Sequence, residues 1–353
     1  MRICVVADPH WSQNSSIVRG RGEVYSQRLE NLIQSVNWAE NLAAFQQCGA
    51  IFYIGDFFDS CQLNSEEISA MREVRWSPIS HVFLTGNHET NVGSLEYSTT
   101  DIFNLCPNSV VINKPEIYTI DGVSGCEIAF LPYILERDRK SLDEYFPVNP
   151  ALKRIIFSHN DLKDVRYGPI ISREGFTVDE IHNNCSLFLN GHIHHGFAVT
   201  DKIINVGNLT GQNFTEDASK FDHCVAIVNT DNLHIDYYCN PHAFNFYKLD
   251  FTHNHSVTDL KSMISNLKSN AVITLKVESS FIKEAREFME SVGKHFVHTY
   301  RIITNNDIVQ ALETNDVDLA KMDHIEQFRN YVMENIGTTD LIMGELNHVI
   351  GGI

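Results

Sequence analysis

The chain has 353 residues, of which 43% are hydrophobic, enough to bury a sizeable core and to form more than one domain. No apolar run approaches the ~20 residues of a membrane-spanning helix, and no basic region precedes the first apolar segment, so the sequence predicts neither a membrane segment nor a signal peptide. Eight cysteines lie scattered without a C-x-x-C pair, which favours reduced thiols in a cytoplasmic protein over a zinc-thiolate site.

The formal net charge is −18, whereas an enzyme that acts on nucleic acid usually carries a basic surface. Part of the acidic excess is local. Residues 305–353 hold nine acidic and two basic side chains, a net charge of −7, which leaves −11 for residues 1–304. The balance predicts that the chain alone binds DNA weakly.

The first part of the chain alternates strands and helices and then becomes rich in strands. An apolar strand is expected over residues 1–7, and a helical period of apolar residues predicts a helix over residues 25–45. Helices are also expected near residues 65–75 and 94–105. Further strands are expected at residues 50–54, 79–85, 109–113, 126–132, 153–158, 185–190, 203–207 and 223–229. This order predicts an α/β fold over residues 1–240, a two-sheet β-sandwich flanked by helices.

After Pro241 the pattern restarts and predicts a small α+β domain over residues 241–304. Its expected elements are strands at 244–251, 271–278 and 294–303, with helices at 256–268 and 280–292. Residues 305–353 are predicted to form a helical tail. One helical stripe of the tail is apolar and consists of Ile325, Phe328, Val332 and Ile336.

Five short polar motifs stand at the ends of predicted strands, where α/β folds place their chemistry. They are Asp8-Pro9-His10, Gly55-Asp56-Phe57-Phe58-Asp59, Gly86-Asn87-His88-Glu89, Ser158-His159 and Gly191-His192-Ile193-His194. Taken singly, each motif also fits an ordinary turn or a structural histidine. Five in one chain favour phosphodiester hydrolysis, for which two metal ions ~3.5–4 Å apart can activate a water and neutralise the phosphoryl oxygens.

The residue types in these motifs suit divalent ions. Carboxylates, imidazoles and an amide oxygen favour manganese, with magnesium as the second candidate, over ions that prefer thiolates. Side chains two apart in an extended strand end share one side, so Asp8 and His10 can reach one ion, and the same alternation directs His195 away from the site. Asp59 either supports a ligand or caps the following loop.

Two residues receive distinct roles from their positions. Asp56 follows a glycine and can bridge two ions with its two oxygens. His88 points away from its neighbour Asn87, so we interpret it as a general acid or phosphate-stabilising group, because the unperturbed pKa of histidine lies near neutrality. A serine nucleophile is disfavoured, since the chain contains no G-x-S-x-G motif, and no Walker-type phosphate-binding loop is present.

The motif order D-x-H, GD-x-x-D, GNH, H and GH-x-H resembles that of the calcineurin-like metallophosphoesterase superfamily over residues 1–240. Within it, GDFFD, the small second domain and the acidic tail with DHIEQFRNYVMENIG resemble the SbcD-type DNA repair and recombination nucleases. The compact size suggests a bacteriophage version, which would act in the host cytoplasm. Glu89 stands where aspartate is commoner, and Asp8-Pro9-His10 lacks the tryptophan that often precedes this histidine.

The resemblance implies a four-layer fold and two divalent ions. One ion would be held by Asp8, His10 and His194, and the other by Asn87, His159 and His192. Asp56 would bridge them and His88 would be catalytic. The resemblance also implies a DNA-facing cap over residues 241–304, a tail over residues 305–353 that binds an SMC-like ATPase of SbcC type, and a homodimer contact through the helices near 65–75 and 94–105.

Two alternative functions remain at this point. The first is a small-molecule or protein phosphoesterase on the same fold, which would have little need of the segment 241–353. The second is an inactive DNA-binding subunit, against which the retention of every candidate ligand argues.

Overall fold

A computed structural model describes residues 1–13, 21–91, 94–120, 123, 125–149, 151–167, 170–214, 216–251, 256–291 and 298–304. The chain divides into two compact units. The first unit comprises Met1–Val165 and Ile171–Phe246. The second comprises the short segment Arg166–Ile170 and the chain from Tyr247 onward.

The first sheet of the first unit has the strand order β16-β15-β1-β2-β3-β6. Strands β1, β2, β3 and β6 are parallel, and β15 and β16 add antiparallel pairs at the edge beside β1. The bounds are β1 Arg2–Val6, β2 Ala50–Ile54, β3 Ser80–Leu84, β6 Ser109–Ile112, β15 Cys224–Asn229 and β16 Ile235–Cys239.

The second sheet has the order β13-β14-β12-β9-β8-β7. Its four inner strands are parallel, and β13 and β7 close the edges as antiparallel strands. The bounds are β7 Glu116–Tyr118, β8 Cys126–Leu131, β9 Lys153–Ser158, β12 Leu187–Asn190, β13 Phe197–Ala198 and β14 Ile203–Asn205.

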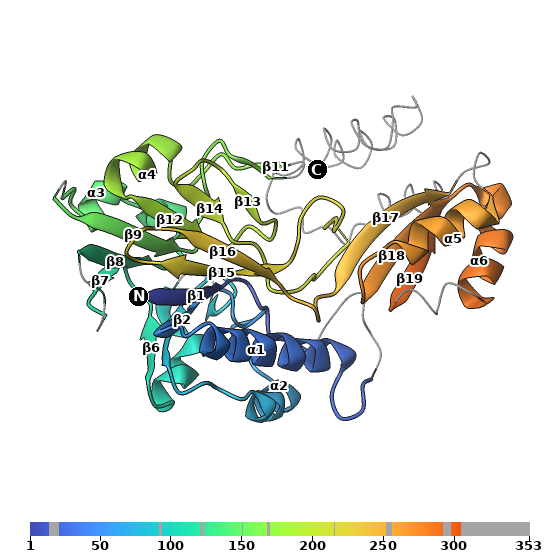
Figure 1. Cartoon of the computed structure of the whole chain (residues 1–353), viewed down its shortest axis with the longest axis horizontal. Coiled ribbons are helices and arrows are strands. Elements are labelled where there is room, and N and C mark those ends of the chain that lie inside the picture. Colours follow the sequence, from blue (N-terminus) through green and yellow to red (C-terminus); the bar gives the residue numbers. More distant parts are fainter. Residues whose placement is uncertain are drawn as a thin grey trace. The chain divides into compact units, whose positions relative to one another are not determined.

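The two sheets pack face to face because their strands are apolar on both faces. The inner core joins side chains such as Val5 and Phe52 of the first sheet to Phe130, Phe157 and Leu189 of the second. The opposite face of the first sheet forms another core with helix α1 (Gln27–Phe45). Figure 1 shows the resulting layers of helix, sheet, sheet and helix, so the predicted fold class is confirmed.

Helices α1, α2 (Ser65–Ala70) and α4 (Val178–Asn184) of the first unit begin at side-chain caps, which satisfy N–H groups that lack partners within the helix. The Ser26 hydroxyl accepts from the Leu29 N–H at 3.2 Å at the start of α1. Asn64 and Thr177 form capping boxes with glutamates three residues on. The other helices of the unit are α3 Leu142–Tyr145 and the 3₁₀ helices η1 Met71–Glu73, η2 Thr99–Leu105 and η3 Glu136–Asp138.

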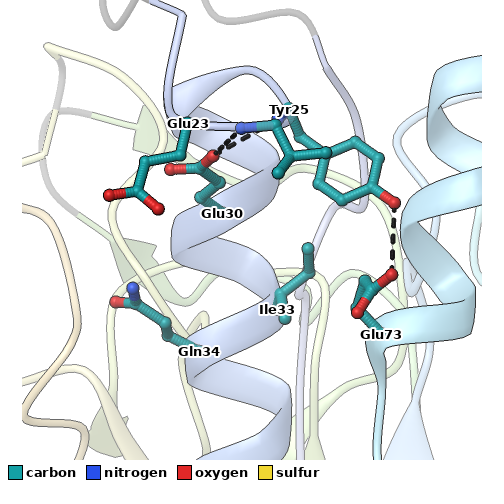
Figure 2. Close-up of a pocket in the computed structure, with 7 residues that line it drawn as sticks. Glu23, Tyr25, Glu30, Ile33, Gln34 and Glu73 are labelled. Carbon is teal, nitrogen blue, oxygen red and sulfur yellow. Dashed lines mark hydrogen bonds between the residues drawn. The ribbon is translucent and has the colours of Figure 1, made fainter.

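A surface pocket of about 490 Å³ lies over the first turns of α1 and is lined in part by Glu23, Glu30 and Glu73. Two of these acids form hydrogen bonds within the protein (Figure 2). Glu30 accepts from the Tyr25 N–H at 3.2 Å, and Glu73 accepts from the Tyr25 hydroxyl at 3.4 Å. These bonds fasten the chain that leads into the helix. None of the predicted site residues lines this pocket.

The second unit contains a three-stranded sheet of order β17-β18-β19, in which β18 and β19 are parallel. Its helices bury an apolar stripe that includes Leu260 and Ile264 on α5 and Ala285, Phe288 and Met289 on α6. The bounds are β17 Asn245–Phe251, α5 Val257–Ser265, β18 Ala271–Val277, η4 Ser279–Phe281, α6 Ile282–Ser291 and β19 Thr299–Ile303. The expected β-α-β-α-β order is present.

The prediction of a helix over residues 94–105 is wrong in its first half. Ser94–Ser98 forms strand β5, which pairs with β4 (Thr90–Asn91), and only Thr99–Leu105 is helical. The reason is local, because the Ser98 hydroxyl accepts from the Thr100 N–H at 3.2 Å and starts the turn there. The two-residue strands β10 Arg166–Tyr167 and β11 Ile170–Ile171 also carry no clear sequence pattern.

The predicted helix near 65–75 ends as a helix at Ala70 and continues as η1 to Glu73. The predicted helical tail and its apolar stripe lie outside the described residues. In the part of the chain that the structure describes, every helix is too short or too polar to cross a membrane.

Candidate metal centre

The five motifs meet because their strands are neighbours. Strands β1, β2 and β3 run parallel in one sheet, and β9 and β12 run parallel in the other, so each group ends at one edge. A bond from His159 Nδ1 to the Ile54 carbonyl at 2.9 Å joins the two edges. The Asp8 N–H donates to the Gly55 carbonyl at 3.3 Å, and the Gly191 N–H donates to the Ser158 carbonyl at 2.9 Å.

Four of the candidate ligands have left-handed backbone conformations. The φ values are 48° at Asp8, 50° at His10, 46° at Asp56 and 71° at His192. Such conformations cost ~1–3 kcal/mol each in a residue other than glycine and persist only where the surroundings enforce them. Their concentration at these strand ends indicates that the backbone bends to direct the side chains into one site.

Glycines provide the room for this convergence. Gly55 has φ 91°, and a Cβ at this position would overlap the His159 ring. A Cβ at Gly86 would overlap the Asp56 carboxylate. A side chain at either position would displace a candidate ligand, which explains a glycine before Asp56 and before Asn87.

Asp8, His10 and His194 form the first set of converging ligand atoms, all within 4.8 Å of one another. His194 Nε2 lies 3.1 Å from His10 Nε2, and the latter lies 3.9 Å from Asp8 Oδ1. Two ligands bound at ~2.1 Å to one ion and at right angles to each other would be about 3 Å apart. The two imidazole nitrogens therefore have the separation that a shared cation requires.

Asp56, His159 and His192 form the second set, again within 4.8 Å. His159 Nε2 lies 3.1 Å from Asp56 Oδ2. The Asn87 amide oxygen lies 3.2 Å from His159 Nε2 and 2.9 Å from His192 Nδ1, so it belongs to the same set.

Asp56 stands between the two sets. The same Oδ2 atom that faces His159 lies 3.7 Å from His10 Nε2. Its other oxygen accepts from the His88 N–H at 2.9 Å, which fixes the carboxylate plane. The residue thus contacts members of both sets, as a bridging ligand would.

His88 lies at the rim of the centre, and 41% of its side chain is exposed. Its Nε2 is 4.0 Å from Asp56 Oδ2, and its Nδ1 donates to the Asp59 carbonyl at 3.1 Å. A third possible group joins His10, Asp56 and His88. The four remaining histidines of the centre each belong to one of the first two sets. Of the third group, His88 is the residue that faces solvent, where a substrate would approach.

The electrostatics of the centre fit divalent cations. Burial, reinforced by nearby Asp56, raises the pKa of Asp8 well above its ordinary value. Burial also acts to raise the pKa of Asp56, but the imidazoles of His159, His10 and His88 together outweigh it and hold that pKa well below the ordinary value. Burial lowers the pKa of His10 to about 4, so its imidazole is neutral at pH 7 and can ligate a metal. Buried carboxylates beside the neutral imidazole of His10 form a donor set that cations would stabilise.

Asp59 supports a ligand and does not act as a loop cap in this site. Its Oδ1 accepts from His10 Nδ1 at 2.8 Å, which leaves the Nε2 lone pair of that ring facing the centre. His195 lies against Phe221, with ring centroids 4.6 Å apart, as expected for a residue directed away from the ligands.

Three acids near the centre were not singled out as site residues from the sequence. Glu89, which stands where aspartate is commoner, is fully buried and accepts from the Gly86, Asp56 and Phe58 N–H groups at 2.6, 3.1 and 3.0 Å. It therefore fastens two motif loops together. The position of Glu89 directly after His88 in the third motif could have marked it as a site residue. Asp161 and Glu216 face His192 and His194 from other segments, and no sequence pattern marks them.

Ligand sets at the strand ends of a two-sheet α/β sandwich define a class of protein, the metal-dependent phosphoesterases. The family model for calcineurin-like phosphoesterases matches residues 1–196, more than half of the chain. The chain therefore belongs to the calcineurin-like phosphoesterase family. No curated protein matches the chain.

Solved structures show a distant likeness. A dimetal phosphatase from Danio rerio is 12% identical, with 68% of this chain and 96% of that chain covered and a TM-score of 0.40. A protein of Thermus thermophilus is 11% identical, with 67% and 98% covered and a TM-score of 0.40. A metallophosphoesterase from Sphaerobacter thermophilus is 15% identical, with 68% and 88% covered and a TM-score of 0.30. Identities of 11–15% and TM-scores of 0.30–0.40 do not indicate a shared substrate.

Proposed function

We propose that this chain is a manganese-dependent DNA exonuclease and endonuclease subunit of an SbcCD-type repair or recombination complex. The supporting observation is the second unit. Residues 247–304 contain eight basic and six acidic side chains, a net charge of +2, whereas residues 1–246 carry −13. A small, relatively basic α+β unit after an acidic phosphoesterase unit suits a polyanionic substrate, which a small-molecule phosphatase does not need.

The residues divide the chemistry among them. When two divalent ions are bound, they would activate a water and neutralise charge on the phosphoryl oxygens. Asp8, His10 and His194 would hold one ion, Asn87, His159 and His192 the other, and Asp56 both. His88 is exposed at the rim, its Nδ1 donates to the Asp59 carbonyl, and its Nε2 lies 4.0 Å from Asp56 Oδ2. When the ring is protonated at both nitrogens, Nε2 would donate a proton toward the leaving oxygen or stabilise the phosphoryl group by its charge.

The proposal includes two protein partners. Residues 305–353 would dock an amphipathic helix on an SMC-like ATPase of SbcC type, as helix-in-groove recognition requires. A second copy of the chain would contact the segment that contains α2 and η2. Such an ATPase would supply the duplex-binding charge that a chain of net charge −18 lacks.

The test uses purified full-length protein with manganese on linear duplex DNA, single-stranded DNA and bis-p-nitrophenyl phosphate, with and without a co-expressed ATPase. Manganese-dependent cleavage of DNA and of the small diester is expected. Asp56→Asn should abolish both, because loss of the bridging charge disturbs both metal sets. Near-wild-type turnover by Asp56→Asn would refute the two-metal mechanism. Hydrolysis of phosphomonoesters or phosphoproteins with no cleavage of DNA would favour the alternative, a phosphoesterase of smaller or protein substrates.

A further inference from the structure

The histidines of the centre share an arrangement in which one ring nitrogen faces the ligand set and the other faces a fixed oxygen. His10 Nδ1 donates to Asp59 at 2.8 Å, and His159 Nδ1 donates to the Ile54 carbonyl at 2.9 Å. Such outer acceptors set the orientation of a metal-binding imidazole and increase its basicity. His194 needs an equivalent acceptor if it is to keep Nε2 toward His10.

Glu216 occupies that position. Its Oε1 lies 3.6 Å from His194 Nδ1, on the side of the ring opposite the nitrogen that faces His10. Only 1% of the residue is exposed. This separation is longer than the 2.8 Å bond between Asp59 and His10 and exceeds hydrogen-bond length, so the carboxylate acts on the ring through its charge.

The Glu216 carboxylate is itself held in place from several directions. It accepts from Asn208 Nδ2 at 3.2 Å and from the Gln212 N–H at 3.1 and 3.2 Å, and His223 Nε2 lies 3.9 Å away. The Gln212 side chain in turn donates to the Asp8 carbonyl at 3.2 Å. The acid is therefore fixed relative to two members of the first ligand set, Asp8 and His194.

We infer that Glu216 is a positioning residue for the first metal set, where its buried carboxylate holds His194 with Nε2 toward the ion. The inference rests on the two-metal centre proposed above. It predicts an asymmetry between the two sets, because the contacts of Glu216 described above reach the first set and none of the second.

The competing role for Glu216 is to fasten its own loop through Asn208 and Gln212. Glu216→Gln separates the two roles. Glutamine keeps a side-chain oxygen that can accept from the same N–H donors, whereas the negative charge beside His194 is lost. The neighbouring Asp217 offers a matched control, since it bonds Ser219 and Lys220 within its own turn.

The experiment titrates manganese into full-length wild type, Glu216→Gln and Asp217→Asn, with free ion followed by electron paramagnetic resonance and unfolding temperatures measured in EDTA. Wild type and Asp217→Asn should bind two ions alike. Glu216→Gln should bind one ion normally and the other ~10–100-fold more weakly, with little change in the unfolding temperature without metal.

Several outcomes would overturn the inference. If Glu216→Gln binds both ions with the affinities of the wild type, Glu216 has no positioning role. If its affinity for both ions falls and its unfolding temperature without metal falls strongly, Glu216 acts by stabilising its own loop. If Glu216→Gln fails to fold, Glu216→Asp provides the test: its carboxylate is one methylene farther from His194, so selective weakening of one ion is expected and unchanged binding refutes the inference. Failure of wild type to bind manganese would instead refute the proposed metal centre itself.

Discussion

His88 is the residue whose role most sharply separates catalysis from metal binding. General acid–base help is worth ~10²–10⁴-fold, so His88→Ala should lose turnover on DNA by about that factor while still binding two manganese ions. The loss should be smaller on bis-p-nitrophenyl phosphate, because nitrophenolate leaves without much need of a proton. Turnover with manganese titration measures both effects.

His195→Ala is the control for that experiment, since its ring packs on Phe221 and should leave turnover unchanged. Disappearance of one bound ion in His88→Ala would make His88 a ligand, as its place in a group with His10 and Asp56 allows.

Glu40 is a buried acid with a structural role on the inner face of helix α1. Its carboxylate accepts from the Tyr53 hydroxyl at 2.6 Å, the Ser77 hydroxyl at 2.6 Å and His81 Nε2 at 3.1 Å. Burial acts to raise the pKa of Glu40, but the hydrogen bonds from His81, Ser77 and Tyr53 outweigh it and lower that pKa below its ordinary value. The charged form is therefore the one that stabilises the fold.

Glu40→Ala should consequently lower the free energy of unfolding by ~3 kcal/mol at pH 7, because buried donors lose their acceptor. A depressed pKa contributes stability that is present above the unfolded-state value, near 4.5, and is lost as the pH falls through the lower folded-state value. The difference between wild type and Glu40→Ala should shrink below about pH 4.5. Urea unfolding in EDTA at several pH values measures it, and a difference that grows on acidification would contradict the assignment.

At the scale of elements, the segment with α2 and η2 carries the proposed homodimer contact. Exposed apolar side chains on these elements include Ile68 on α2 and Ile102 and Leu105 on η2, and Leu105 is 84% exposed. Leu105→Glu should weaken self-association by ~2 kcal/mol or more, about 30-fold in Kd. Sedimentation equilibrium of the full chain measures this change.

Phe45 at the end of α1 is a matched control, because it is 81% exposed and lies outside the proposed contact. Phe45→Glu should leave association unchanged. A wild-type chain that is monomeric at micromolar concentration would refute the homodimer, and dissociation by Phe45→Glu alone would place the contact elsewhere.

At the scale of the whole molecule, charge is distributed unevenly among the parts of the chain. Residues 305–353 carry a net charge of −7. We expect their acidic groups to speed association with a basic partner surface, on which the apolar residues Ile325, Phe328, Val332 and Ile336 would dock. Deletion of residues 305–353 should leave activity on bis-p-nitrophenyl phosphate intact and end ATP-dependent stimulation of DNA cleavage by a co-expressed SMC-like ATPase. If the truncated chain unfolds or loses the small-substrate activity, the tail belongs to the phosphoesterase core.

Most buried strands could be predicted because their apolar runs are local and continuous. Strand β2 has the predicted bounds Ala50–Ile54 and strand β9 the predicted bounds Lys153–Ser158. The helix expected over residues 94–105 shows the limit of this approach. The cap at Ser98 and the pairing of β5 with β4 decide the backbone of its first half.

The sequence by itself indicated the class of chemistry, since each candidate metal ligand follows a predicted strand and can be recognised within its own short motif. The tertiary structure showed which candidate ligands lie within 4.8 Å of one another, a grouping that the sequence implied only through the family resemblance. It alone revealed which acids face their imidazoles. His192 N–H donates to Asp8 from 184 positions away along the chain, and the two strands β13 and β14 separate Glu216 from His194 in the sequence. Such pairings carry no local signal, because they arise from the packing of two sheets whose strand ends meet at one edge.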